Sequence, residues 1–185
     1  TLKDMANKSF WNEASRGGAV VGLVNVGLSL IGMALPSISF VASLINFVAT
    51  IYLLFYFTRR RSLLFYKEGY TYTESLGFIV AMGIFAGIIA GAYQIVASNF
   101  LFKEMFEETF NTSIATLKQT GLYTNEMMDQ MVTMMRSYTF SPLPALLANI
   151  FGNVLYFGFC GLFISIGTKR EPEIFDINIP DEEDE

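Results

Sequence analysis

The 185-residue chain contains no histidine, and its only cysteine, Cys160, lies in an apolar run. Without histidine, the chain lacks the commonest general base and the commonest transition-metal ligand of proteins. A single cysteine can form neither a disulfide framework nor a thiolate metal site within one chain. Charged residues are also absent from three long stretches, residues 17–57, 75–102 and 137–168. The sequence therefore predicts no enzyme, no cofactor and no metal site, and it predicts long segments suited to an apolar environment.

These uncharged stretches are long enough to cross a membrane. The chain is 52% hydrophobic and 15% aromatic, which is more apolar than is usual for a soluble domain. A spanning helix needs roughly 20 apolar residues. Four such spans fit, at about residues 17–35, 38–57, 75–102 and 143–167. We therefore predict an all-α fold, an integral membrane four-helix bundle that forms one domain over residues 1–170.

A ridge of glycines marks the third span. Gly83, Gly87 and Gly91 recur at every fourth position, so at helical pitch they form one smooth face, as in a glycine zipper. In lipid, small residues let two helix backbones approach closely, and such contacts drive helix association. We predict that this ridge packs against another helix. Three further glycines are candidate helix-packing positions in the first and fourth spans: Gly18, Gly22 and Gly152.

Amide side chains are the main polar groups inside the predicted spans. The candidate intramembrane polar residues are Asn25, Asn46, Gln94, Asn149 and Asn153. Buried amides in a helical bundle commonly form hydrogen bonds to neighbouring helices. They can also line a path for a neutral solute or an ion, and this alternative stays open. No ionisable residue lies within the predicted spans, whereas a proton-coupled pump usually has one.

Basic residues predict the orientation of the chain. Arg59, Arg60 and Arg61 follow the second span directly, and nine of the twelve lysines and arginines fall on the side of this cluster. Because basic segments near span ends stay cytoplasmic, we predict a multi-pass protein of the bacterial inner membrane with both termini in the cytoplasm. The three arginines are also candidate contacts for lipid headgroups or a partner. Residues 1–16 carry basic and aromatic side chains, which favours a short helix at headgroup level or a frayed terminus.

Residues 103–141 are expected on the opposite side, as an outer (periplasmic) amphipathic helical hairpin between spans three and four. Phe106 and Phe110 lie on an apolar face in its first half, and Gly121 separates the two halves. The apolar face of the second half, a candidate contact for lipid or a partner, consists of Met127, Met131, Met134 and Tyr138. Thioethers are soft ligands for Cu(I). With no histidine or cysteine nearby, we interpret the methionines as a docking face.

The last fifteen residues, 171–185, contain eight acidic side chains and two prolines. This composition predicts a disordered cytoplasmic tail. Within it, Phe175, Ile177 and Ile179 alternate with polar residues, a pattern that suits a strand added to the sheet edge of a partner. The tail is therefore a further candidate contact.

Several local motifs together resemble a known family. They are the turn from Gly69 to Glu74, the Asn99-Phe100 exit from the third span, and the outer segment Thr-Gly-Leu-Tyr-Thr-Asn-Glu-Met-Met-Asp-Gln-Met. Over residues 10–170 the chain resembles the uncharacterised four-span inner-membrane family common in Bacteroidota. The resemblance implies a four-span fold and carries no assigned activity and no catalytic residues. Members are often encoded near membrane-associated family 2 glycosyltransferases, which implies such an enzyme as a candidate partner.

The sequence thus predicts many helix-contact positions and little chemistry. We interpret the chain as a non-catalytic subunit or scaffold of an inner-membrane complex, which anchors a membrane-associated glycosyltransferase as its candidate partner. The expected partners are membrane lipids and another membrane or membrane-associated protein, with a homo-oligomer as an alternative and no nucleic acid. The competing hypothesis is a small transporter or channel for a neutral solute or ion, which works as an oligomer and is lined by the intramembrane amides.

Overall fold

The computed structural model describes residues 2–65 and 68–171, with the side chains of residues 2–8 left out. Lys67 and the predicted strand-like contacts Phe175, Ile177 and Ile179 lie outside the described residues. The helices are α1 (Leu2–Ala34), α2 (Ser39–Leu64), α3 (Tyr72–Val96), α4 (Lys103–Gln119), α5 (Asn125–Phe140) and α6 (Pro142–Thr168). A 3-10 turn, η1 (Pro36–Ile38), joins α1 to α2, and a π-helical segment, η2 (Ala97–Leu101), extends α3.

Four of these helices are long and apolar enough to cross a membrane. The candidate spans are Ser9–Ala34, Pro36–Leu64, Tyr72–Leu101 and Pro142–Thr168. Within the described residues the chain has no strand, only one isolated bridge between residues 70 and 170. The prediction of an all-α fold with four membrane-spanning helices is therefore confirmed.

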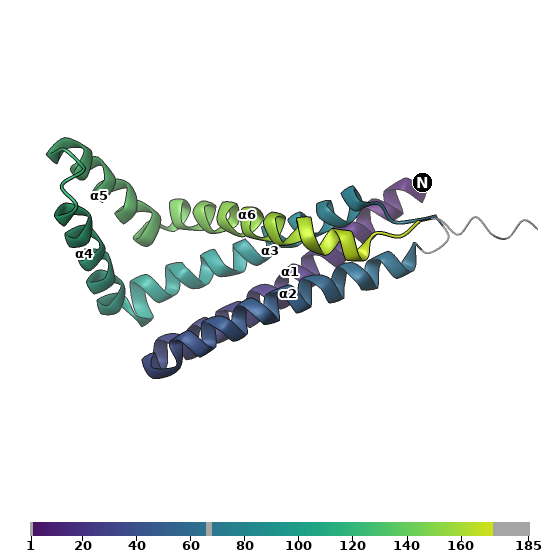
Figure 1. Cartoon of the computed structure of the whole chain (residues 1–185), viewed down its shortest axis with the longest axis horizontal. Helices are drawn as coiled ribbons and strands as arrows, with labels where there is room; N and C mark the ends of the chain where they lie inside the picture. Colours follow the sequence, from purple (N-terminus) through teal and green to yellow (C-terminus); the bar gives the residue numbers. More distant parts are fainter. Residues whose placement is uncertain (1, 66–67, 172–185) are drawn as a thin grey trace, which may run out of the picture.

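The spans run alternately between two ends of the molecule (Figure 1). At the end that we call the basic end, α1 begins, α2 ends, α3 begins and α6 ends. There the backbones of Tyr70 and Arg170 exchange two hydrogen bonds, of 2.9 and 2.8 Å, which tie the start of α3 to the end of α6. At the other end, the hairpin end, α4 and α5 project from α3 and α6 (Figure 1). Helix α3 packs on α1 along one face and on α6 along another.

Helix α1 is continuous from Leu2, so the expectation of a separate short helix or a frayed end over residues 1–16 is wrong. The reason is that its apolar face continues into this segment at helical spacing. The ring of Phe10 lies 5.7 Å from that of Phe78, and Ala14 is fully buried. Helix α2 likewise continues through the three arginines to Leu64, beyond the predicted end at residue 57.

A capping box starts α3, as the sequence predicts. Thr71 Oγ1 accepts a hydrogen bond from the Glu74 backbone N–H (3.2 Å), and the Glu74 carboxylate accepts one from the Thr71 backbone N–H (2.8 Å). These reciprocal bonds satisfy two donors that a helix start otherwise leaves free. At its other end, Ser98 Oγ and Asn99 Nδ2 donate to backbone carbonyls at the end of α5, at 3.1 and 3.2 Å.

Helices α4 and α5 form a helical hairpin that has a small core of its own. Phe110, Ile114 and Met128 are buried in this core, and the ring of Phe110 lies 6.0 Å from that of Phe140. Gly121 lies between the two helices with a φ of +65°, a conformation that glycine adopts readily. The predicted break at Gly121 is confirmed, and the apolar face of the first half contributes Phe110 to this core.

Candidate functional site

The glycine ridge of α3 faces α6 of the same chain. A Cβ atom added at Gly87 would lie 2.5 Å from the Cα of Ile150, and one added at Gly91 would lie 3.0 Å from the Cα of Leu146. At Gly83 the added atom would lie 3.1 Å from a backbone carbonyl oxygen of α6. Such distances are too short for a side chain, so the two backbones touch. This surface is therefore used inside the bundle and is not free for another subunit.

A second set of glycines packs α1 on another face of α3. An added Cβ at Gly18 would collide with the Met82 carbonyl oxygen, and one at Gly22 would lie 3.2 Å from the Cα of Ala86. Gly152 differs, because an added Cβ there would meet nothing within 4 Å, so it makes no close contact with another helix of the chain. On the same helix, Gly161 packs tightly against α3, where an added Cβ would lie 2.9 Å from a side-chain atom of Leu76.

The intramembrane amides form two separate hydrogen-bonded groups. Between α3 and α6, Asn149 Nδ2 donates to Gln94 Oε1 at 2.7 Å. Gln94 Nε2 in turn donates to a backbone carbonyl of α5 at 3.3 Å. Between α1 and α2, Thr50 Oγ1 lies 3.0 Å from Asn25 Oδ1, to which it donates. Asn153 donates only to the Asn149 carbonyl of its own helix, at 2.9 Å.

Three of the five amides line one cavity. It has a volume of about 290 Å³ and lies between α1, α3, α4 and α6. Its polar lining comprises Asn25, Ser29, Tyr93, Gln94 and Asn149. A neighbouring cavity of about 270 Å³ between α1 and α2 shares Ser29 and includes Asn46, whose Oδ1 is buried without a hydrogen-bond partner among the described residues. Asn153 lines neither cavity.

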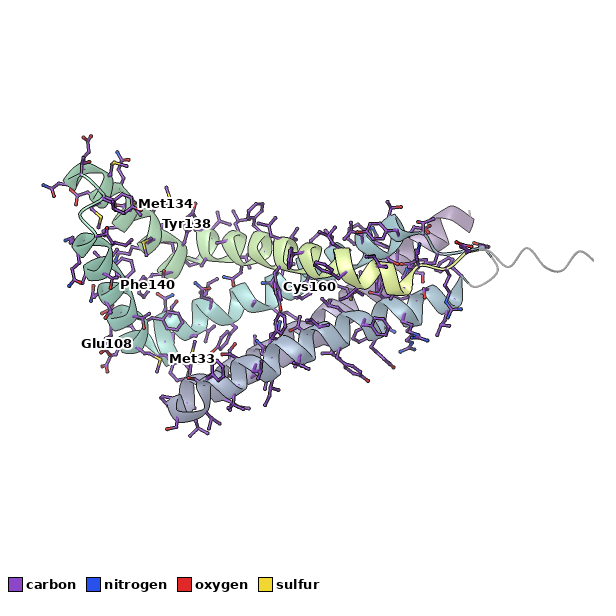
Figure 2. The ribbon with its side chains drawn as sticks, viewed as in Figure 1. Met33, Glu108, Met134, Tyr138, Phe140 and Cys160 are labelled. Atoms are coloured by element: carbon purple, nitrogen blue, oxygen red, sulfur yellow. The ribbon has the colours of Figure 1, made fainter. Side chains whose placement is uncertain are left out.

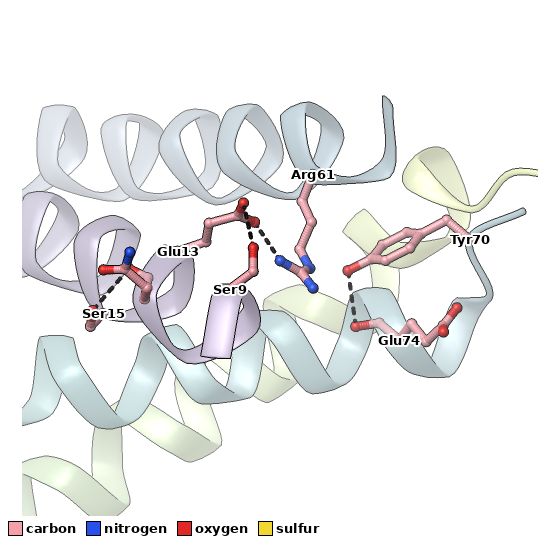
Figure 3. Close-up of polar contacts among 7 residues, drawn as sticks. Ser9, Glu13, Ser15, Arg61, Tyr70 and Glu74 are labelled. Atoms are coloured by element: carbon pink, nitrogen blue, oxygen red, sulfur yellow. Dashed lines mark hydrogen bonds and ion pairs between the residues drawn. The ribbon is translucent and has the colours of Figure 1, made fainter. Parts of the chain in front are cut away.

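A buried ion pair occupies the basic end of the bundle, and Figure 3 shows its geometry. The guanidinium of Arg61 donates from Nη1 to the Glu13 carboxylate, and Arg61 is only 6% exposed. It also lies over the rings of Phe10, Phe65 and Phe78, at 5.1 to 5.2 Å from their centroids. We call this group the arginine centre.

The arginine centre corrects two predictions. Arg61 is not an open contact for lipid or a partner, because it is buried and paired, whereas Arg59 and Arg60 are exposed. The spanning helices α1 and α2 also contain an ionisable pair, whereas the sequence predicted spans without ionisable residues. Glu13 and Arg61 are 48 residues apart, and the antiparallel packing of α1 and α2 brings them together. No local sequence signal pairs them.

Tyr70 borders the arginine centre from the loop before α3 (Figure 3). Its hydroxyl donates to the Glu74 backbone carbonyl at 3.3 Å, and the residue is 3% exposed. Burial raises the pKa of Tyr70 to about 12, although the nearby Arg61 guanidinium counteracts part of this rise in pKa. The phenol therefore stays neutral at physiological pH and adds no negative charge to the centre.

The apolar face predicted on α5 is exposed except at Met131, which is half-buried. Met127 and Met134 are 50% and 56% exposed, and Figure 2 shows Met134 and Tyr138 on the side of α5 that faces away from α4. The face that packs on α4 contains Met128 and Met135 instead. The five methionines of α5 thus point to different sides, which does not favour a shared Cu(I) site. The described residues contain no cluster of His, Cys, Asp or Glu that can hold a metal ion.

A concave surface runs across the junction of α5 and α6. A hollow of about 610 Å³ is lined by Tyr138, Leu143, Pro144, Leu147, Ala148, Phe151 and Gly152. It meets a second hollow of about 720 Å³, which is lined by Glu126, Asp129, Gln130, Thr133, Met134, Ser137, Tyr138 and Pro144. The two hollows share Tyr138 and Pro144, and we call them together the elbow groove. The groove is polar on α5 and apolar on α6.

Comparison with known proteins identifies a family and no relative of known function. A family model described as a protein of unknown function (DUF4199) matches residues 16–170. This match confirms the resemblance to an uncharacterised family. No curated protein and no solved structure matches the chain.

Proposed function

We propose that this chain, which belongs to the DUF4199 family of unknown function, is a non-catalytic subunit that holds a partner in a membrane complex. The elbow groove is the observation that carries this proposal. It is concave, it continues from a membrane-spanning helix onto the hairpin, and the bundle leaves it uncovered. An exposed apolar surface that polar residues border is typical of a site for another protein.

The lining of the groove suits a helix of a partner protein. Pro144, Ala148 and Gly152 lie four residues apart, so they form a strip of small or flat side chains along α6. Such a strip lets a second helix approach closely within the membrane. On the hairpin, Glu126 and Asp129 add acidic groups to the rim, where a basic or polar segment of the partner would bind.

A membrane-associated glycosyltransferase is the candidate partner at the basic end. Arg59 and Arg60 are exposed there, so they are available to an acidic surface or to lipid headgroups. We expect charge reversal at these two positions to release such an enzyme from the purified complex. Arg61 is left unchanged in this test, because its loss would disturb the bundle itself.

We expect the protein to lie in the bacterial inner membrane, with the basic end on the cytoplasmic side and the hairpin on the opposite side. We expect an impermeant thiol reagent, added to intact cells, to label Thr116→Cys and to spare Glu68→Cys. Both residues are exposed, and both variants are made in a Cys160→Ala background. The asymmetry of basic residues is the reason for this expectation. Labelling at position 68 with protection at position 116 would show that the orientation is the opposite one.

A transporter or channel for a neutral solute or ion is the second candidate. The convergence of Asn25, Gln94 and Asn149 on one cavity favours it, because amides can replace the hydration of a solute inside a membrane. Against it, the Asn149 and Gln94 side chains already bond to each other, which supports a structural role. Flux in liposomes of the purified protein that Asn149→Leu abolishes would favour transport over the scaffold.

The variant Gly152→Leu tests the proposal that the chain holds a partner at the elbow groove. A leucine there would fill the elbow groove without a clash, because an added Cβ meets nothing within 4 Å. We expect recovery of the partner in a mild-detergent pull-down, quantified by mass spectrometry, to fall by about tenfold, which corresponds to about 1.4 kcal/mol. Gly77→Leu is the matched control, since Gly77 is also exposed and uncrowded but lies on α3, away from the groove.

The result of this pull-down separates a partner protein bound at the elbow groove from a homo-oligomer. Loss of the same protein with Gly152→Leu, and its retention with Gly77→Leu, would support docking at the groove. If repeated gentle purifications recover only further copies of this chain, the scaffold proposal fails and a homo-oligomer replaces it. Thermal unfolding of both variants checks that the four-span bundle remains folded.

A further inference from the structure

A cavity next to the arginine centre remains unfilled by the ion pair. It has a volume of about 200 Å³ and lies at the basic end, between α1, α2 and α3. Its lining consists of Glu13, Arg16, Phe57, Arg60, Arg61, Leu64 and Phe78. One wall is apolar, and the rest consists of three guanidinium groups and one carboxylate. The arginine centre thus forms one side of a cavity with its own chemistry.

The cavity carries an excess of positive charge. Glu13 accepts a hydrogen bond from Arg61, so the single carboxylate is already engaged. Arg16 and Arg60 are exposed and add two further positive charges to the lining. Within the described residues, Arg61 Nε is buried and has no hydrogen-bond partner. A buried donor without an acceptor is unfavourable, and the excess positive charge of the lining would stabilise a bound anion.

Phosphate is the anion that best fits this lining. Guanidinium groups bind phosphate oxygens through paired, charge-assisted hydrogen bonds. The apolar wall of Phe57, Leu64 and Phe78 suits the ester-linked part of a phosphate compound. The cavity also lies near the ends of three candidate spans, those of α1, α2 and α3, where lipid headgroups are found. We propose that this cavity binds a phosphate group, carried by an anionic lipid headgroup or by a free phosphate.

Lipid binding in nanodiscs tests the proposal. The protein is reconstituted in phosphatidylcholine discs with and without phosphatidylglycerol, and the bound lipid is measured by native mass spectrometry after release from the discs. We expect Arg60→Gln and Arg16→Gln each to weaken retention of phosphatidylglycerol by about fivefold. Arg59→Gln is the matched control. It removes the same charge from the adjacent residue, but Arg59 lies over Phe55 and does not line the cavity.

A second arm identifies the source of the phosphate. Inorganic phosphate is added to the protein in phosphatidylcholine discs, and the shift in thermal unfolding is compared with that caused by phosphatidylglycerol. Stabilisation by inorganic phosphate that Arg60→Gln removes would support the site with a soluble ligand. Stabilisation by phosphatidylglycerol alone would support it with a lipid. Equal losses in the Arg59→Gln and Arg60→Gln variants, or no stabilisation by either phosphate source, would overturn the proposal.

Discussion

Replacement of Gly87 by leucine is expected to separate α3 from α6 and to destabilise the whole bundle. The added Cβ alone would lie 2.5 Å from the Cα of Ile150 and 3.0 Å from the Asn149 carbonyl oxygen. Both atoms belong to the backbone, so no side-chain rotation can relieve the clash. Overpacking of this kind costs about 3 kcal/mol or more, which corresponds to a decrease of about 10 °C in the melting temperature of a chain of this length.

Thermal unfolding in detergent measures this effect, and the fluorescence of Trp11, the only tryptophan, is a convenient signal. Gly77→Leu controls for the loss of a helical glycine, because nothing lies within 4 Å of its added Cβ. We expect this control to melt within a few degrees of the native protein. Equal melting temperatures for Gly87→Leu and the native protein would mean that the ridge does not pack against α6 in the membrane.

Local patterns were sufficient to predict the features that depend on neighbouring residues in sequence. The spacing of Gly83, Gly87 and Gly91 defines a smooth helix face whatever helix lies against it. Thr71 and Glu74 form a capping box within a single turn. Uncharged length alone distinguishes a membrane-spanning helix from other helices. The four-span, all-helical fold could therefore be predicted from the sequence.

Features that depend on a distant helix could not be predicted in this way. Met127 and Met134, like Met128 and Met135, follow helical spacing, so periodicity cannot decide which pair faces α4. Gly152 and Gly161 differ only in what lies opposite them.

Charge was also a poor guide to the ends of helices. The predicted spans were drawn where charged residues begin, so Glu13 and Arg61 fell outside them. In the fold, each residue neutralises the other across α1 and α2, and both remain within long helices. Burial of a charge is tolerated when a partner and further contacts compensate for it.

Removal of Glu13 is expected to cost more than the simultaneous removal of both partners of the ion pair. Glu13→Met leaves the Arg61 charge buried without a carboxylate, since the Arg61 side chain is only 7% exposed. Loss of one partner of a buried pair costs about 3–5 kcal/mol. Because the Glu13 side chain is 34% exposed and water therefore weakens the pair, we expect the lower end, about 3 kcal/mol.

The double variant Glu13→Met, Arg61→Met is expected to recover most of this loss. Methionine packs well against aromatic rings, and the Arg61 side chain lies among Phe10, Phe65 and Phe78. Replacement of a buried ion pair by apolar residues is often neutral or stabilising. The measurement is a double-mutant cycle of unfolding free energies in detergent, with Arg59→Met as a control for the loss of an exposed arginine. If the double variant loses at least the sum of the two single losses, Glu13 and Arg61 are not coupled, and Arg61 stabilises the bundle through its aromatic contacts and not through the ion pair.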